Sequence, residues 1–303
     1  MLATSRRLRN TSLVIAPALA AALASAVVAA PPAHAATGHY VALGDSYTAG
    51  PGIPNQTDAN CGRSDRNYPT LTAAGLPAAA FTDASCAGAT TAHMTASQGT
   101  APPQLDALRL DTGLVTLGIG GNDIDVSGII ARCVILGKLN PWGSPCKTSY
   151  TVAGIDPIGG RIAATGDKVD AVLQEIKRRS PAADVLVVGY PVIMPDDGSN
   201  CYSTVPIAKG DAPWLRDVEK RLNAMLAARA AANGATYVDT YAGSVGHDLC
   251  KPLGVRWMEP MEGVDSVGLH PNAAGHEAMA AAVQATAAQA GAARTAAVQE
   301  AAQ

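Results

Sequence analysis

The sequence predicts a three-layer α/β/α sandwich built around one parallel β-sheet. Two patterns in the 303 residues support this prediction. Five short segments are almost continuously apolar, which is typical of strands covered on both faces of a parallel sheet. Longer amphipathic segments alternate with them, as expected of helices that cover the two faces. No interior stretch has the composition of a linker, so we expect a single domain over residues 36–303.

The predicted strands are short and end at glycines, a proline or polar residues. They are Tyr40–Gly44, Ala79–Thr82, Leu114–Ile119, Asp184–Tyr190 and Ala235–Asp239. In open α/β sheets, ligands bind beyond the carboxyl ends of the strands. The loops that follow these segments are therefore the first place to search for functional residues.

The predicted helices are identified by apolar spacing and capping residues. They span Pro103–Leu110, Gly160–Arg179 and Ala212–Ala232, and a last helix follows Pro271. Asp211 is expected to cap the third of them. Two stretches lack apolar periodicity. Residues 137–160, rich in Gly and Pro, are expected to form a long loop, and the tail after about residue 291 is expected to fray.

The first 35 residues have the features of a secretory signal peptide. Arginines at positions 6, 7 and 9 precede the uncharged apolar run Leu13–Ala30, and Ala33-His34-Ala35 forms a small-x-small cleavage site. The alternative is a membrane anchor, but the run is alanine-rich and contains Pro17. We expect cleavage before residue 36 and secretion to the extracellular space. A partial twin-arginine motif leaves the export route open.

The charge balance argues against two classes of partner. The whole chain has a net charge of −3, and removing the three arginines of the leader from 22 basic residues leaves 19 against 25 acidic ones, or −6. Nucleic-acid grooves and polybasic membrane surfaces both need a positive stripe. A hydrophobic content of 48% with only 16% charged residues also excludes a disordered chain.

Cysteine usage agrees with an oxidising compartment. Six cysteines follow the leader, namely Cys61, Cys86, Cys133, Cys146, Cys201 and Cys250. An even count behind a signal peptide suggests three disulfides, although sequence spacing alone does not choose the pairing. A zinc site is disfavoured because the chain has no Cys-x-x-Cys and no His at ligand spacing from a cysteine pair.

Two glycine-rich loops carry candidate chemistry. Ser46 follows the first strand and lies between Gly44 and Gly50, where a serine can act as a nucleophile with its backbone N–H facing the site. The alternative is a simple helix cap. Asn122 follows the third strand, and its side-chain amide can stabilise an oxyanion. Its alternative is a tight turn. Dinucleotide binding fits poorly, because Asp123 stands where a third glycine is needed.

A histidine opens the last helix. His270 precedes Pro271 at the helix start, which would hold the imidazole rigidly enough for a general base, although lone histidines are more often structural. His276, six residues later, is interpreted as a satisfied or exposed helical histidine. The pair does not form His-Glu-x-x-His, so a metalloprotease is disfavoured.

The order of these blocks is more specific than any one of them. Gly44-Asp45-Ser46, Gly120-Gly121-Asn122-Asp123 and His270-Pro271-Asn272 together resemble the GDSL family of the SGNH hydrolase superfamily, and in particular its secreted actinomycete lipases and esterases. The resemblance spans about residues 40–290. It implies a flavodoxin-like parallel sheet, hydrolysis of small-molecule or lipid esters, and no cofactor or metal. It also implies the pairs Cys61–Cys86, Cys133–Cys146 and Cys201–Cys250.

The resemblance also implies a role for each matching residue. Ser46 corresponds to the nucleophile, with its N–H as one oxyanion donor, and Asn122 corresponds to the side-chain donor. Gly88, in Cys86-Ala87-Gly88-Ala89-Thr90, is the best match for the remaining N–H donor. His270 corresponds to the base that takes the serine proton. Asp45 and Asp123 are interpreted as bracing their turns.

One position departs from the family pattern. Many members place an Asp three residues before the histidine, where this chain has Val267. We favour a Ser46–His270 dyad oriented by a backbone carbonyl between Ser266 and Gly268, as in some secreted relatives. Asp265 is the alternative orienting group. The α/β-hydrolase elbow Gly-x-Ser-x-Gly is absent, because Thr48 replaces its last glycine.

The substrate stays open at this point. A lipase, a phospholipase and a carbohydrate O-acetyl esterase could use the same residues, and a silent cell-surface binding module is the non-enzymatic alternative. The run Ile129–Leu136 could line a groove for an acyl tail or form the buried face of a helix. We expect a monomer that neither binds nucleic acid nor stays inserted in a membrane after cleavage of the leader.

Overall fold

The computed structural model describes residues 1–2, 38–76, 80–151 and 154–301. The chain divides into two compact units, Met1–Pro32 and Ala33–Gln303, and the description below concerns the second. The predicted signal peptide lies outside the described residues apart from residues 1 and 2. None of the described helices is long and apolar enough to span a membrane.

The predicted parallel sheet is confirmed. Five strands lie in the order β4-β1-β5-β6-β7, and every neighbouring pair is parallel. Their bounds are β1 His39–Gly44, β4 Ala80–Asp83, β5 Thr112–Gly118, β6 Asp184–Val188 and β7 Thr236–Val238. This is the flavodoxin-like order. The strands that follow β1 in sequence lie on both sides of it, and a crevice opens at the carboxyl end of β1 where the strand order reverses. A small antiparallel hairpin, β2 Gln56–Asp58 with β3 Arg63–Ser64, was not predicted.

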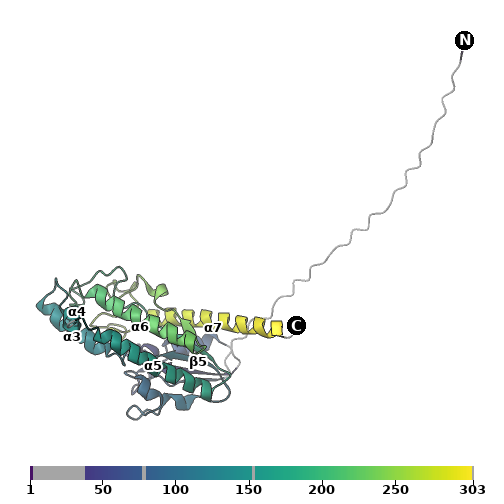
Figure 1. Ribbon diagram of the computed structural model, residues 1–303, viewed down its shortest axis with the longest axis horizontal. Coiled ribbons are helices and arrows are strands. Elements are labelled where there is room, and N and C mark those ends of the chain that lie inside the picture. The colour runs from purple at the N-terminus through teal and green to yellow at the C-terminus, as the bar shows by residue number, and fades with distance from the viewer. Residues whose placement is uncertain (3–37, 77–79, 152–153, 302–303) are drawn as a thin grey trace. The chain divides into compact units, whose positions relative to one another are not determined.

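Helices cover both faces of the sheet (Figure 1). Their bounds are α1 Ser46–Ala49, α2 Tyr68–Gly75, α3 Val126–Leu139, α4 Pro145–Tyr150, α5 Pro157–Arg179, α6 Ala212–Ala232 and α7 Ala273–Ala301, with 3₁₀ turns at Thr91–Met94, Gln104–Ala107 and Ala242–Ser244. Alternate side chains of β1 lie on opposite faces of the sheet and pack in different layers. Val41 and Leu43 belong to the core under α3, α5 and α6, whereas Tyr40 and Ala42 belong to the core under α2 and α7.

The predicted long loop over residues 137–160 is wrong. Helix α3 runs to Leu139, α4 occupies Pro145–Tyr150, and α5 begins at Pro157. Gly137 lies inside α3 because the chain at Pro206 approaches it closely: a Cβ at residue 137 would lie 2.3 Å from the Pro206 carbonyl oxygen. This glycine therefore serves helix packing rather than a turn.

Asp211 has a different partner from the one predicted. It occupies the N-cap position of α6, but its side chain makes no capping bond there. Its carboxylate instead accepts the backbone N–H groups of Cys146 and Lys147, at 3.0 and 2.8 Å, in the first turn of α4. Asp211 thus fastens α4 to the start of α6, a tertiary contact that local capping rules do not anticipate.

Two further segments differ from the sequence prediction. The predicted helix Pro103–Leu110 is only a 3₁₀ turn, Gln104–Ala107. Helix α7 continues to Ala301, past the point at which fraying is predicted. Those of its side chains after Gly291 that the structure describes are exposed, so nothing packs against them, and the fraying stays a prediction.

The three disulfides implied by the resemblance are present. They join Cys61–Cys86, Cys133–Cys146 and Cys201–Cys250 across 25, 13 and 49 residues of chain. The first fixes the segment after β4, the second joins α3 to α4, and the third anchors the loop after β6.

Candidate active site

Ser46 and His270 meet beyond the carboxyl end of β1. Ser46 is the first residue of α1, and the Asp45 carboxylate caps that helix by accepting the Tyr47 N–H at 2.9 Å. The Ser46 Oγ lies 2.8 Å from the His270 Nε2, although 224 residues separate the two in sequence. Ser46 is 8% exposed. The hydroxyl is therefore within range to pass its proton to the imidazole.

A backbone carbonyl orients His270. The second ring nitrogen, Nδ1, lies 2.9 Å from the Gly268 carbonyl oxygen, so an Nδ1–H donates there and Nε2 is left as the acceptor facing Ser46. The alternative partner Asp265 is exposed and makes no hydrogen bond to His270. Burial lowers the pKa of His270 below its usual value, while the Gly268 carbonyl raises it by a smaller amount.

Close backbone packing sets the shape of the loop before His270. A Cβ on Gly268 would lie 2.3 Å from the Met261 carbonyl oxygen, and Leu269 adopts a φ of +64°. The Glu259 side chain, fully buried, accepts from Arg256, Asn272 and the Val264 N–H. Glu259 also exchanges backbone bonds with Leu269 and His270. The loop is thus held by main-chain bonds around one buried carboxylate.

Three loops converge on Ser46 from neighbouring strands. The Cys86 N–H donates to the Gly44 carbonyl at 3.0 Å, which ties the loop after β4 to the loop after β1. The Asn122 amide donates to the Ala89 carbonyl at 2.8 Å, which ties in the loop after β5. Gly88 lies between these two contacts, with a φ of +79° that favours glycine.

Free donors remain at this junction. In the part of the chain that the structure describes, neither the Ser46 N–H nor the Gly88 N–H donates to a protein acceptor. The Asn122 amide carries two hydrogens, and its bond to Ala89 uses one of them. An oxyanion formed next to Ser46 could therefore receive hydrogen bonds from all three blocks.

The structure adds a residue that the sequence analysis missed. Tyr190, two residues after β6, donates its hydroxyl to the Asp45 carboxylate at 2.6 Å and accepts the Gly121 N–H at 2.8 Å. It thereby links the serine loop to the Asn122 loop. Its position just past a strand end is the signal that could have found it. Burial raises the pKa of Asp45 to about 7, and the Tyr190 bond opposes that shift.

Comparisons with known proteins agree with this geometry. Residues 42–278 match the model of the GDSL-like lipase/acylhydrolase family. The chain belongs to this family.

Individual relatives support the assignment. Lipase 2 of Streptomyces coelicolor is 41% identical over 284 residues, covering 91% of this chain and 95% of that protein. The crystal structure of phospholipase A1 from Streptomyces albidoflavus superposes with a TM-score of 0.68 at 28% identity, covering 82% of this chain and 99% of that one. The extracellular lipase of Streptomyces rimosus gives 0.63 at 27% identity, with the same coverage. This GDSL hydrolase is therefore a carboxylic ester hydrolase, which sets aside the silent binding module.

Two other polar residues of the GDSL hydrolase have structural partners. The Asp123 carboxylate accepts the N–H and hydroxyl of Thr91, at 2.9 and 2.5 Å, and so braces its loop. His276 is fully buried in α7, where its Nδ1 accepts the Tyr68 N–H at 3.0 Å and joins α7 to α2. Its Nε2 has no partner among the described residues, and burial lowers its pKa to about 3. The histidine is thus buried and only half satisfied.

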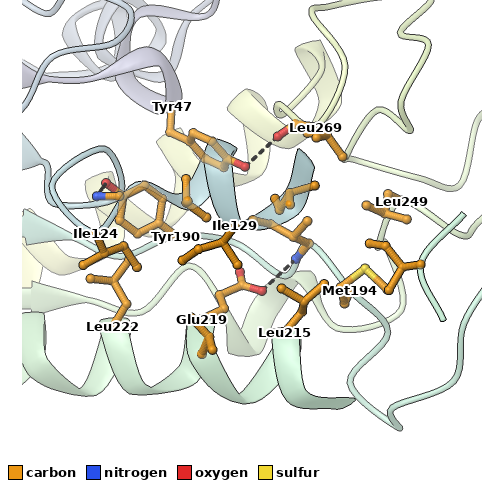
Figure 2. Close-up of a pocket in the computed structure, with 16 residues that line it drawn as sticks. Tyr47, Ile124, Ile129, Tyr190, Met194, Leu215, Glu219, Leu222, Leu249 and Leu269 are labelled. Carbon is orange, nitrogen blue, oxygen red and sulfur yellow. Dashed lines mark hydrogen bonds between the residues drawn. The ribbon is translucent and has the colours of Figure 1, made fainter. Parts of the chain in front are cut away.

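A mostly apolar cavity lies next to the dyad of this hydrolase (Figure 2). Tyr47 and Leu269, the chain neighbours of Ser46 and His270, form one end of its wall and are joined by a Tyr47 hydroxyl bond of 2.6 Å to the Leu269 carbonyl. Apart from Tyr190 and Glu219, the rest of the wall is apolar, contributed by α3, α6, the loops after β5 and β6 and the loop before α7. Ile129 and Ile130 line the cavity and, with Cys133 and Val134, are the buried residues of the run Ile129–Leu136, whereas Ile135 of the same run is exposed.

Proposed function

We propose that this protein is a secreted serine lipase or esterase that hydrolyses carboxylic esters through an acyl-enzyme on Ser46. The observation that carries the proposal is the 2.8 Å contact between Ser46 Oγ and a His270 whose other nitrogen is fixed by the Gly268 carbonyl. Ser46 attacks the acyl carbon as its proton moves to His270 Nε2. His270 then protonates the leaving alcohol, and water releases the acid by the reverse steps.

The Ser46 N–H, the Gly88 N–H and the Asn122 side chain hold the negative oxygen of each tetrahedral intermediate. Such donors act because they are fixed before charge develops, and removing one typically lowers kcat by about 10²–10³. The bond from Asn122 to the Ala89 carbonyl supports this role, since it fixes the amide beside the Gly88 turn.

The cavity favours acyl chains longer than acetyl. Its walls are mostly aliphatic, and they include Tyr47 and Leu269, which adjoin Ser46 and His270 in the chain. A carbohydrate O-acetyl esterase would have no use for this space. A phospholipase is the second candidate, because the phospholipase A1 of Streptomyces albidoflavus shares the fold and 28% of the residues.

The first test compares wild type with Ser46→Ala on p-nitrophenyl esters from acetate to palmitate. Wild type should hydrolyse the series with an optimum above acetate, and the variant should lose at least about 10⁴-fold in kcat while keeping its circular-dichroism spectrum. Near-normal turnover by the variant would show that Ser46 is not the nucleophile. An activity optimum at acetate would contradict the assignment as a lipase. A phosphatidylcholine assay in the same buffers separates lipase from phospholipase.

Export completes the proposal. The leader-like sequence, the three disulfides and the extracellular relative from Streptomyces rimosus support it. Amino-terminal sequencing of protein recovered from the medium of an exporting host should find a chain that begins near residue 36. Recovery only from the cell membrane, with the leader intact, would favour the anchor instead.

A further inference from the structure

A carboxyl group interrupts the aliphatic wall of the cavity. Glu219 lies on α6 between Leu215 and Leu222, which line the same cavity at helical spacing. Figure 2 shows its side chain rising from the helix toward Ile129, with the carboxyl inside the ring of apolar residues. The residue is 7% exposed. A position that helical periodicity would assign to an apolar side chain thus holds an acid.

Only half of this carboxyl is satisfied. Its Oε2 accepts the Ile193 N–H at 3.2 Å. Its Oε1 is buried and has no hydrogen-bond partner among the described residues. Burial raises the pKa of Glu219 well above its usual value, and the nearby charge of Lys220 opposes this only in part. Burial therefore favours the protonated acid, which has one O–H to donate and no acceptor for it among the described residues.

An unpaired buried polar group destabilises the fold. The Ile193 N–H needs only one acceptor, and Oε2 supplies it. Hydrogen bonding among the described residues therefore does not explain why Oε1 is buried without a partner. An unsubstituted alkyl chain in the cavity would increase the cost of burying Oε1, because it would exclude water without supplying a hydrogen-bond partner.

We propose that the cavity selects an acyl chain that carries an oxygen function, such as a hydroxyl or keto group, part-way along its length, and that Glu219 pairs with this oxygen. The inference rests on the proposed function, since it assumes that Ser46 holds the acyl carbon. Tyr47, which adjoins Ser46 in the chain, and Glu219 line the same cavity, and the proposal places one acyl chain from Ser46 past Tyr47 to Glu219. Glu219 is then a specificity residue of the ester hydrolysis.

The test measures kcat/KM for p-nitrophenyl stearate and for a series of hydroxystearates in which the hydroxyl moves along the chain. At the position that matches Glu219, wild type should prefer the hydroxyacyl ester about tenfold or more, the worth of one hydrogen bond with its avoided desolvation. Glu219→Leu should abolish or reverse this preference. The matched control is Leu222→Met, which alters the same wall but keeps the carboxyl, and which should retain the preference.

An equal rate for plain and hydroxylated chains at every position, or a preference that survives in Glu219→Leu, overturns the inference while leaving the esterase intact. Failure of wild type to hydrolyse any ester would instead overturn the proposed function.

A second measurement covers the case in which Glu219→Leu does not fold, because that variant leaves the Ile193 N–H without its acceptor. Glu219→Gln keeps an acceptor there and serves to assign the infrared C=O band of the protonated carboxyl, which should vanish in it. In Ser46→Ala protein, adding the matching hydroxystearic acid should shift this band, and stearic acid should not. A band that responds equally to both acids contradicts the pairing.

Discussion

The hydrogen-bond partner of His270 Nδ1 is a neutral carbonyl rather than a carboxylate. The Gly268 carbonyl fixes the tautomer, but it stabilises the protonated imidazole less than an Asp would. Burial adds to this effect by disfavouring the charged ring. The histidine is thus kept neutral, and ready to accept a proton, over a wider range of pH than a free imidazole.

This predicts the acid limb of the pH–rate profile. Because the pKa of His270 is lowered from 6.5, kcat/KM should fall as the pH drops through a midpoint below 6.5. The measurement is kcat/KM for p-nitrophenyl butyrate between pH 4 and 9. A midpoint above 6.5 would indicate a nearby carboxylate and would restore Asp265 as the orienting group.

Sequence reasoning found the residues that carry a recognisable chemistry next to a strand end or helix start. Ser46, Asn122 and His270 fall in this class, and the structure brings their loops together. Tyr190 and Glu219 escaped because their importance comes from a partner far away in sequence. A tyrosine after a strand, or a glutamate on an amphipathic helix, is ordinary until Asp45 or the cavity is seen beside it.

At the scale of elements, the strands were predictable and the region between α3 and α5 was not. Buried parallel strands are uniformly apolar, and that signal is local. The glycines and prolines of residues 137–160 suggested a loop, but Gly137 serves close packing, and Pro145 and Pro157 stand in the first turns of helices. What decides these helices is tertiary: the Cys133–Cys146 bridge and the Asp211 carboxylate hold α4 in place.

The disulfides predict an order of stability. Replacing both cysteines of a pair by Ala should lower the free energy of unfolding by about 3 kcal/mol for Cys133–Cys146 and by about 4 kcal/mol for Cys201–Cys250, because the second closes a longer loop. Urea unfolding of the exported, oxidised proteins measures this difference.

The Cys133–Cys146 variant has a functional readout as well. Ile129 and Ile130 line the cavity one turn before Cys133, so loosening α3 should reduce kcat/KM for palmitate more than for acetate. The Cys61–Cys86 variant, whose cysteines do not line the cavity, is the control and should not show this selective loss. An equal fall in kcat/KM for both esters in the Cys133–Cys146 variant would show that α3 does not contribute to acyl binding.

At the scale of the whole molecule, the sheet order explains why distant loops converge. The site lies where the chain leaves β1 toward both β4 and β5, and this follows from topology once the strands are known to be parallel. The cavity could not be predicted in this way. Its walls combine two helices and several loops whose mutual placement depends on packing of the entire second unit.

Two buried groups predict how stability depends on pH. His276 has a folded-state pKa near 3, below its unfolded value of 6.5. Its contribution to the free energy of unfolding is therefore complete above pH 6.5 and is lost as the pH falls. Asp45 has a folded-state pKa of about 7, above 3.8, so its contribution is complete below pH 3.8 and is lost as the pH rises toward 7.

Urea unfolding between pH 4 and 8 separates the two. Relative to wild type, His276→Gln should gain stability as the pH falls below 6.5, because the variant has no imidazole to protonate on unfolding. Asp45→Asn should gain relative stability as the pH rises from 4 to 7. Each variant serves as the control for the other, and a difference from wild type that does not change with pH would contradict the assigned direction for that residue.

The carbonyl partner of His270 has a consequence for how the protein tolerates mutation. A peptide oxygen is present whatever side chain its residue carries, so no single codon encodes the orienting group in the way that a triad Asp is encoded. The genetic constraint moves instead to the positions that shape the main chain, such as Gly263 and Gly268, where an added Cβ would meet backbone oxygen at 1.9 and 2.3 Å. With His270 in the proposed role, we expect substitutions at residue 265 to leave turnover unchanged and substitutions at these two glycines to reduce it.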